Sequence, residues 1–310
     1  MITILKTTDQ GLEKIEELAD GSWVNLINPG SDEVARLRER LAIPTDFFTY
    51  PLDLDEQARV EREDGALLII VRVPEYVGEG SDVPYTTLPL GIVLTDKTIA
   101  TICRQRCSVV EELATGRMRG LSTTKRNRFV LQLLLLTAKR YLQYLKEINK
   151  MVDFLEDKLQ LSLRNREVLE LLKYQKSLTY FTTALKGNEM MMARLERGHL
   201  FHMYPDDEDL LDDVQTEIGQ AIEMTAISSG ILSQMMDAFA SIISNNLNVV
   251  MKFLASVTII LALPAMVASI YGMNITLPLA EHPLAFWITM GISAAISLVV
   301  IVIFARKDWL

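Results

Sequence analysis

The C-terminal end of the chain contains two long apolar runs. Phe253 to Tyr271 comprises 19 residues without a formal charge, and Pro283 to Ala305 comprises 23. Each run is long enough to cross a hydrocarbon core of about 30 Å as a helix. We therefore predict a transmembrane domain over 248–310, with spans at about 249–271 and 283–305. The alternative is a pair of buried helices in a soluble core.

Positive charges flank this predicted hairpin on one side only. Lys252 precedes the first span, Arg306 and Lys307 follow the second, and the connection at 272–283 contains no Lys or Arg. Cytoplasmic flanks are enriched in Lys and Arg. We therefore expect a multi-pass protein of the cytoplasmic membrane, with the connection outside and both termini in the cytoplasm.

The first 124 residues show mixed periodicity. Short strand-like runs are SWVNLI, ALLIIVRV, LPLGIVL and TIATIC, whereas GLEKIEELAD and SDEVARLRER have helical spacing. YVGEGSDVPYTT indicates a loop between strands, and Asp96-Lys97 indicates a hairpin turn. This mixture predicts an α+β domain over 1–124.

From about Lys125 the 3.6-residue period is uninterrupted, which predicts a bundle of long helices and a stalk over 125–247. Two helices are expected to join near 162–166. A third begins at Pro205, and the next proline is Pro264. One helix of about 100 Å is therefore expected to run on through the first span to Tyr271. The alternative is a break at 244–246.

Charge and composition limit the partners. The chain has 310 residues, with 31 Lys plus Arg against 40 Asp plus Glu, a net charge of -9. Three basic and two acidic residues within 249–310 give that part +1, which leaves -10 for residues 1–248. Nucleic acid is therefore not expected as a partner, because phosphate binding needs a basic surface; cations are favoured. Cys103 and Cys107 are interpreted as reduced thiols rather than a metal or disulfide pair.

Small and polar residues recur at three- and four-residue spacing along the first span. A packing seam between helices is the alternative to a pore lining. Two spans cannot enclose water, so a pore requires several copies around an axis. In such an assembly Met251 and Leu254 would form a hydrophobic constriction, with polar rings of Asn248 and Thr258. The predicted stripe comprises Asn248, Met251, Ala255, Thr258, Ala262, Ala265 and Ser269.

Tyr271-Gly272-Met273-Asn274 directly follows the first span, and only one further span comes after it. In this position the motif resembles the signature of the CorA family of divalent-cation channels. The resemblance implies a homopentameric Mg²⁺ channel with a funnel-shaped αβα cytosolic domain, and a Gly-Met-Asn loop at the outer entrance. Asn274 amide oxygens suit Mg²⁺, which keeps several waters, and Gly272 is expected to permit a tight chain reversal. Met273 is expected to pack.

The same resemblance assigns inner-pore positions to Asn248, Met251 and Leu254. Ala262 and Ala265 stand where bulkier or hydroxylated residues are expected, so a polar ring at those levels is not indicated. The loop at 275–283 contains one carboxylate, Glu281. Concentration of cations at the mouth should therefore be weak.

Family members are commonly closed by Mg²⁺ bound between subunits, so the ion is expected to be both transported and regulatory. The resemblance places one ligand at Asp213, with Asp237 as a second acidic match. Tyr50 occupies the expected partner position, which leaves Asp53 and Asp55 as nearby substitutes. The alternative for all four carboxylates is a solvated surface.

Two other functions compete with Mg²⁺ transport. A carrier of zinc or another transition metal could use His199 and His202, although Met273 favours the magnesium branch. A membrane-tethered sensor would need neither the small-residue stripe nor the Asn-containing loop. The chain has no phosphate-binding loop, H-E-x-x-H or G-x-S-x-G motif, so no enzyme is expected. Co²⁺ and Ni²⁺ are further candidate ions.

Overall fold

The computed structural model describes residues 1–310 except 42, 162–164, 198–204, 275–281 and 310. The chain divides into two compact units, Met1–Gln234 and Met235–Leu310. The division falls inside one helix, α6 (Pro205–Tyr271). The domain boundaries predicted from the sequence, at 124 and 247, differ from this division at 234, and the three predicted domains remain a prediction.

The first unit contains a seven-stranded sheet in the order β2-β1-β3-β7-β6-β5-β4. Its neighbouring strands are antiparallel except β3 and β7, which run parallel with Trp23 opposite Ile99. The strands are β1 (Ile2–Thr8), β2 (Gly11–Ile15), β3 (Trp23–Ile27), β4 (Arg59–Glu63), β5 (Ala66–Tyr76), β6 (Tyr85–Leu94) and β7 (Ile99–Cys103).

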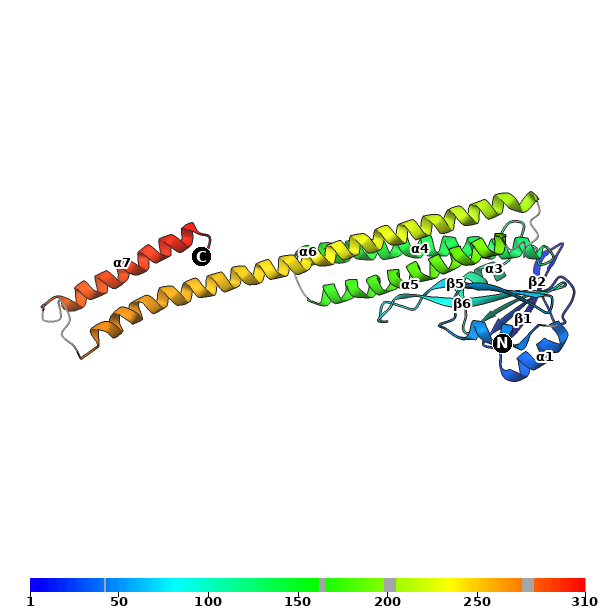
Figure 1. Ribbon diagram of the computed structural model, residues 1–310, viewed down its shortest axis with the longest axis horizontal. Helices are drawn as coiled ribbons and strands as arrows, with labels where there is room; N and C mark the ends of the chain where they lie inside the picture. The colour runs from blue at the N-terminus through cyan, green and yellow to red at the C-terminus, as the bar shows by residue number, and fades with distance from the viewer. Residues whose placement is uncertain (42, 162–164, 198–204, 275–281, 310) are drawn as a thin grey trace. The chain divides into compact units, whose positions relative to one another are not determined.

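Helices cover both faces of this sheet, as expected for an αβα domain (Figure 1). Leu68 and Ile70 of β5 pack with α1 (Ser31–Leu41), α2 (Thr45–Thr49) and the 3-10 turn η1 (Tyr50–Leu52). The alternate residues Ile69 and Val71 pack with α3 (Ser108–Ala114), α4 (Arg126–Leu161), α5 (Asn165–Arg197) and α6. The period-2 alternation of a strand thus builds two cores.

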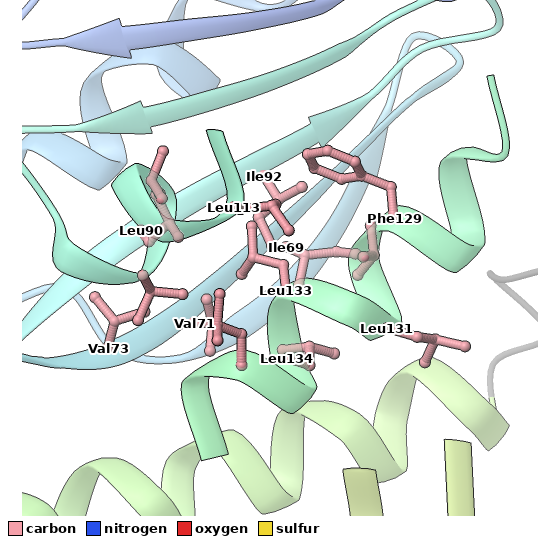
Figure 2. Close-up of a cluster of buried hydrophobic side chains, with 14 of the residues drawn as sticks. Ile69, Val71, Val73, Leu90, Ile92, Leu113, Phe129, Leu131, Leu133 and Leu134 are labelled. Carbon is pink, nitrogen blue, oxygen red and sulfur yellow. The ribbon is translucent and has the colours of Figure 1, made fainter. Parts of the chain in front are cut away.

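Figure 2 shows the core on the α4 side, where side chains of β5 and β6 meet Leu113, Phe129 and Leu133. Phe129 also meets the Trp23 ring at a centroid distance of 5.0 Å. Both α4 and the sheet are nearly continuous in apolar residues here, so their mutual burial stabilises this contact. Cys103 and Cys107 are free cysteines, and both are buried.

Four predicted strands, the helix at Ser31–Leu41, the β6–β7 turn and the two long helices are confirmed. The helix predicted over 11–20 is wrong. Gly11 adopts φ 123°, and β2 pairs with β1 from Thr8 opposite Gly11 onward. Backbone pairing in this edge hairpin therefore overrides the helical spacing of the side chains.

The second unit holds the rest of α6 together with α7 (Ala285–Arg306). The prediction of one helix from Pro205 to Tyr271 is confirmed, and residues 244–246 are helical. Both helices are long and apolar enough to cross a membrane, with mean hydropathies of 2.3 and 2.6 in their most apolar windows. Only 6% of each window is buried within the chain, as expected for surfaces that face lipid or other copies.

Candidate ion-conduction site

In the second unit the membrane segment of α6 presents two faces. Partly or fully shielded residues recur at three- and four-residue intervals, namely Ser256, Ile260, Leu263, Val267 and Tyr271, and Val257 next to Ser256 is also partly shielded. All seven residues of the stripe predicted from the sequence are exposed. At 100° per residue the two faces are centred about 150° apart. Apart from Ala265 at its edge, the stripe therefore lies away from the side of α6 that faces α7.

The N-terminal part of the stripe combines apolar and polar groups. Met251 and Leu254 expose 55% and 56% of their surface. One turn further, Thr258 Oγ1 donates a hydrogen bond to Leu254 O at 2.8 Å. The single hydroxyl proton is thus used within the helix, and the oxygen lone pairs stay available to a cation or its water shell.

The Gly-Met-Asn motif directly follows the C-terminal end of α6. Gly272 N donates to Ala268 O at 3.0 Å and to Ser269 O at 3.2 Å, which extends the last helical turn. Gly272 does not have a positive φ, so the expected reversal does not rely on glycine's conformational freedom at this position. Asn274 is exposed. Glu281 lies outside the described residues.

A groove of about 680 Å³ lies between the C-terminal part of α6 and the N-terminal part of α7. Its lining includes three small residues: Ala268 on α6, Gly272 directly after α6, and Ala285 at the start of α7. Ala265 lines the groove as well, which places this residue at the edge of the stripe rather than at its centre.

Ser256 is a residue that sequence reasoning missed. It is completely buried, and its Oγ lies 2.9 Å from the backbone oxygen of Trp309 beyond the end of α7. A hydroxyl in an otherwise apolar run is a local signal, but its partner is 53 residues away and no spacing rule connects the two.

The regulatory candidates of the first unit lie in the loop after η1. Asp53 and Asp55 are exposed, and Asp53 Oδ1 accepts a hydrogen bond from Asp55 N at 3.1 Å. Tyr50 is engaged differently, because the Arg59 guanidinium lies 4.4 Å above its ring. Tyr50 is therefore occupied by a cation–π contact, whereas the two carboxylates face solvent.

The candidates on α6, Asp213 and Asp237, are also exposed. Within the described part of a single chain, no group of three or more His, Cys, Asp or Glu residues lies close enough to hold a metal ion. A complete metal site built from these carboxylates would therefore need ligands from a second copy or from water.

Arg72 anchors the loop that carries Asp53 and Asp55. Its Nη1 donates to Leu54 O at 2.7 Å and to Glu56 O at 2.8 Å, while Nη2 donates to Thr87 O at 3.0 Å. Burial lowers the pKa of the Arg72 guanidinium, and nearby groups including the two aspartates oppose that shift. The arginine thus fixes the loop backbone and leaves its carboxylates outward.

These features define a class of membrane protein: an αβα unit, a long helix shared with a two-span hairpin, and an exposed polar stripe that ends in an amide-bearing motif. The family model described as "CorA-like Mg2+ transporter protein" matches residues 19–306. The chain therefore belongs to the CorA family of Mg²⁺ transporters.

Named relatives agree with this assignment. The cobalt/magnesium transport protein CorA of Methanocaldococcus jannaschii is 29% identical over all of both chains. The CorA of Thermotoga maritima is 24% identical over 98% of this chain and 88% of that protein. The complete structure of the M. jannaschii CorA magnesium transporter matches with a TM-score of 0.87 at 25% identity, covering 100% of this chain and 99% of that one.

Proposed function

We propose that this protein conducts hydrated Mg²⁺ across the cytoplasmic membrane, down its electrochemical gradient, through a pore built from several copies of α6. The observation that carries the proposal is the exposed stripe, which faces away from α7 and leads to the Gly-Met-Asn motif. Membership of the CorA family supports Mg²⁺ as the ion. Co²⁺ is a second candidate, because both named relatives are cobalt/magnesium transport proteins.

Oligomerisation follows from the size of the hairpin. One α6–α7 pair cannot surround an aqueous path on all sides, so spanning helices of several copies must assemble to enclose one. We propose the homopentamer that the family resemblance implies. In it, each copy turns the stripe to the axis and leaves α7 outside toward lipid.

Selection of the ion is assigned to the ring of Asn274 at the outer end. Mg²⁺ dehydrates reluctantly and holds ligands in octahedral geometry, so neutral amide oxygens can bind its water shell without removing it. Met273 is 53% exposed in one chain, but a thioether is a poor ligand for this hard cation. We assign Met273 to packing between copies and Tyr271 to holding the end of α6.

Closure is assigned to the inner end. Rings of Met251 and Leu254 would form an apolar constriction that blocks ions when it dewets. Thr258 and Asn248 lie about one turn on either side of this pair, so they would offer oxygen atoms to the hydrated ion on both sides of the barrier.

Regulation is assigned to cytosolic Mg²⁺ bound between copies by carboxylates. Asp213 and Asp237 would come from α6 of one copy, and Asp53 and Asp55 from the loop of another. The exposure of all four side chains in one chain supports this assignment. Binding between copies would stabilise the arrangement in which the constriction is closed.

Orientation is assigned from charge. Lys252 before the first span and Arg306 and Lys307 after the second lie at the same membrane surface in a hairpin, which favours the cytoplasm for that surface and for both termini. No enzymatic role is proposed. Nothing in the described residues favours a zinc carrier, and His199 and His202 lie outside them.

The experiment is metal-selective flux into vesicles that contain the purified protein and a Mg²⁺ indicator. We predict Mg²⁺ entry for the wild type and loss of at least about tenfold for Asn274→Ala, since the amide ring that binds the hydrated ion is removed. Asn246→Ala is the matched control: it removes an exposed amide of α6 that lies off the stripe.

Wild-type flux in Asn274→Ala, or an equal loss in Asn246→Ala, would contradict the assignment of the motif. Zinc entry without Mg²⁺ entry would favour the transition-metal carrier. A wild-type protein that conducts no metal would favour the tethered sensor.

A further inference from the structure

The chain folds back on itself after α7. Asp308 adopts φ 53°, and Trp309 N donates to Phe304 O at 3.0 Å while Lys307 N donates to Phe304 O and Ile303 O. The Trp309 and Phe304 rings stack at 5.5 Å with an interplanar angle of 11°. This pattern is a Schellman motif, with a left-handed residue and an apolar contact beyond the helix end.

The reversal turns the backbone carbonyl of Trp309 toward α6. Ser256 Oγ lies 2.9 Å from Trp309 O, 2.8 Å from Lys252 O and 2.9 Å from Phe253 O. The hydroxyl has one proton to share among these acceptors. Only Trp309 O lacks another donor in the described part of the chain, so this carbonyl gains most from the proton.

Ser256 is one of the few residues of the second unit that are buried within the chain. It exposes 0% of its surface, and within the second unit the only other described residue classed as buried besides Phe239 is Ser293. A shielded carbonyl without a donor is costly, and the Ser256 hydroxyl supplies that donor. The contact therefore joins the end of α7 to α6 at a defined level.

The contact lies at the same position along α6 as the proposed constriction. Ser256 lies between Leu254 and Thr258 in sequence, on the side of α6 that faces α7, so it is a neighbour of the pore stripe without belonging to it. We propose that Ser256 and residues 307–309 form a tail clasp, a positioning device that holds the constriction turn of α6 against α7. This inference rests on the proposed transport function.

The clasp has a consequence for leakage. A hydrophobic constriction blocks ions only while its apolar side chains stay close enough to exclude water. Freeing α6 from α7 allows the turn with Met251 and Leu254 to shift, and water then enters. A membrane hydrogen bond averages about 0.6 kcal/mol, which corresponds to about a threefold change in the closed-to-open ratio for each copy.

The test uses the full chain in vesicles with two readouts. The first is the residual Mg²⁺ flux at saturating internal Mg²⁺, and the second is hydrogen exchange of the Trp309 amide. The variants are Ser256→Ala, Ser256→Thr, which keeps a hydroxyl, and a chain that stops after Asp308. Ser297→Ala is the matched control, since Ser297 Oγ is buried and has no hydrogen-bond partner among the described residues.

We expect Ser256→Ala to raise residual flux at least about threefold and to speed exchange at Trp309, whereas Ser256→Thr and Ser297→Ala behave like the wild type. The shortened chain should leak similarly, and adding Ser256→Ala to it should add nothing. Wild-type behaviour of Ser256→Ala in both readouts, or additive effects in the combined variant, would overturn the clasp.

The two proposals fail in different ways. A wild type that carries no Mg²⁺ removes the transport proposal, and the exchange comparison then still decides whether the clasp exists. A wild type that conducts and closes normally, together with an unchanged Ser256→Ala, removes the clasp alone.

Discussion

The side chain of Asn188 provides backbone hydrogen bonds to strand β5 at a position where no neighbouring strand does so. Strand β4 begins only at Arg59, opposite Ile70, so it offers no partner to Arg72 two residues further along β5. The Asn188 side chain takes the place of a neighbouring strand: Oδ1 accepts from Arg72 N at 2.9 Å, and Nδ2 donates to Arg72 O at 2.8 Å. One amide therefore ties α5 to the strand that also holds the loop at 53–57.

Asn188→Leu should lower the free energy of unfolding by about 1–3 kcal/mol, because it leaves the buried N–H of Arg72 without an acceptor. Tyr141→Phe is the milder comparison. The Tyr141 hydroxyl donates to Arg72 O at 3.0 Å, but Asn188 Nδ2 still serves that oxygen when the hydroxyl is lost. Thermal unfolding of the purified protein measures both, and equal losses would contradict this division of roles.

Burial of the Glu75 carboxylate is expected to make the stability of the first unit depend on pH. Its carboxylate accepts hydrogen bonds from Ser108 N at 3.1 Å and Ser108 Oγ at 3.2 Å at the start of α3. Burial raises the pKa of Glu75 above 4.5; the two Ser108 bonds and Arg140 oppose the shift, and Glu111 adds to it. The folded state therefore binds this proton more tightly than the unfolded state.

The stability that Glu75 contributes is thus fully present below pH 4.5 and is lost as the pH rises through its folded pKa. Glu75→Gln removes this titration. We expect the wild type to lose stability relative to Glu75→Gln as the pH rises from about 4 to 7, as measured by the difference in melting temperature. A difference that stays constant, or grows in the opposite direction, would contradict the raised pKa.

At the scale of the elements, α6 belongs to both compact units as one uninterrupted helix of 67 residues. Residues 244–246, Ser-Asn-Asn, are weak helix formers, yet they are helical. Stiffness through this segment is what the proposed regulation requires, because a bound ion at Asp213 must act on a constriction at Met251.

Replacing Asn245 and Asn246 by glycine tests this coupling. Each glycine costs a helix interior about 1 kcal/mol relative to alanine, so the pair should soften α6 and raise the internal Mg²⁺ concentration that halves the flux. The alanine pair is the control and should keep wild-type inhibition. The measurement is Mg²⁺ flux into vesicles as a function of internal Mg²⁺ concentration. Identical inhibition curves for the glycine and alanine pairs would show that α6 does not transmit the signal.

The parts of the fold that sequence predicted are those with long, regular patterns. Strands β5 and β6 and helices α4 and α5 bury long apolar sets, and the apolar runs of α6 and α7 are long and uncharged, so the sequence pattern alone indicates these elements. The hairpin β1–β2 was not predicted because β2 is a short, largely exposed edge strand whose Lys and Glu residues also suit a helix. Ser256 with Trp309 and Asn188 with Arg72 escaped because each is a tertiary contact between distant segments.

At the scale of the whole molecule, the α6–α7 hairpin is expected to pack against other copies and lipid, because a single chain buries little of its apolar surface. Nearly all of its surface is apolar and unburied within one chain, and the stripe and the α7-facing residues divide α6 into two sides. The small residues of the stripe allow this side of α6 to approach the α6 helices of other copies and the water between them. The central claim is therefore that this side of α6, and no other exposed side, faces the ion path.

The most direct test is the accessibility of single introduced cysteines to a membrane-impermeant, positively charged thiol reagent during flux. Ala262 lies on the stripe, and Leu261, its neighbour, is 69% exposed but off the stripe. The native thiols Cys103 and Cys107 are buried, which makes the wild type a low-background control. We predict that the reagent blocks Mg²⁺ flux through Ala262→Cys and leaves Leu261→Cys unaffected. Block of Leu261→Cys with no effect on Ala262→Cys would contradict the account.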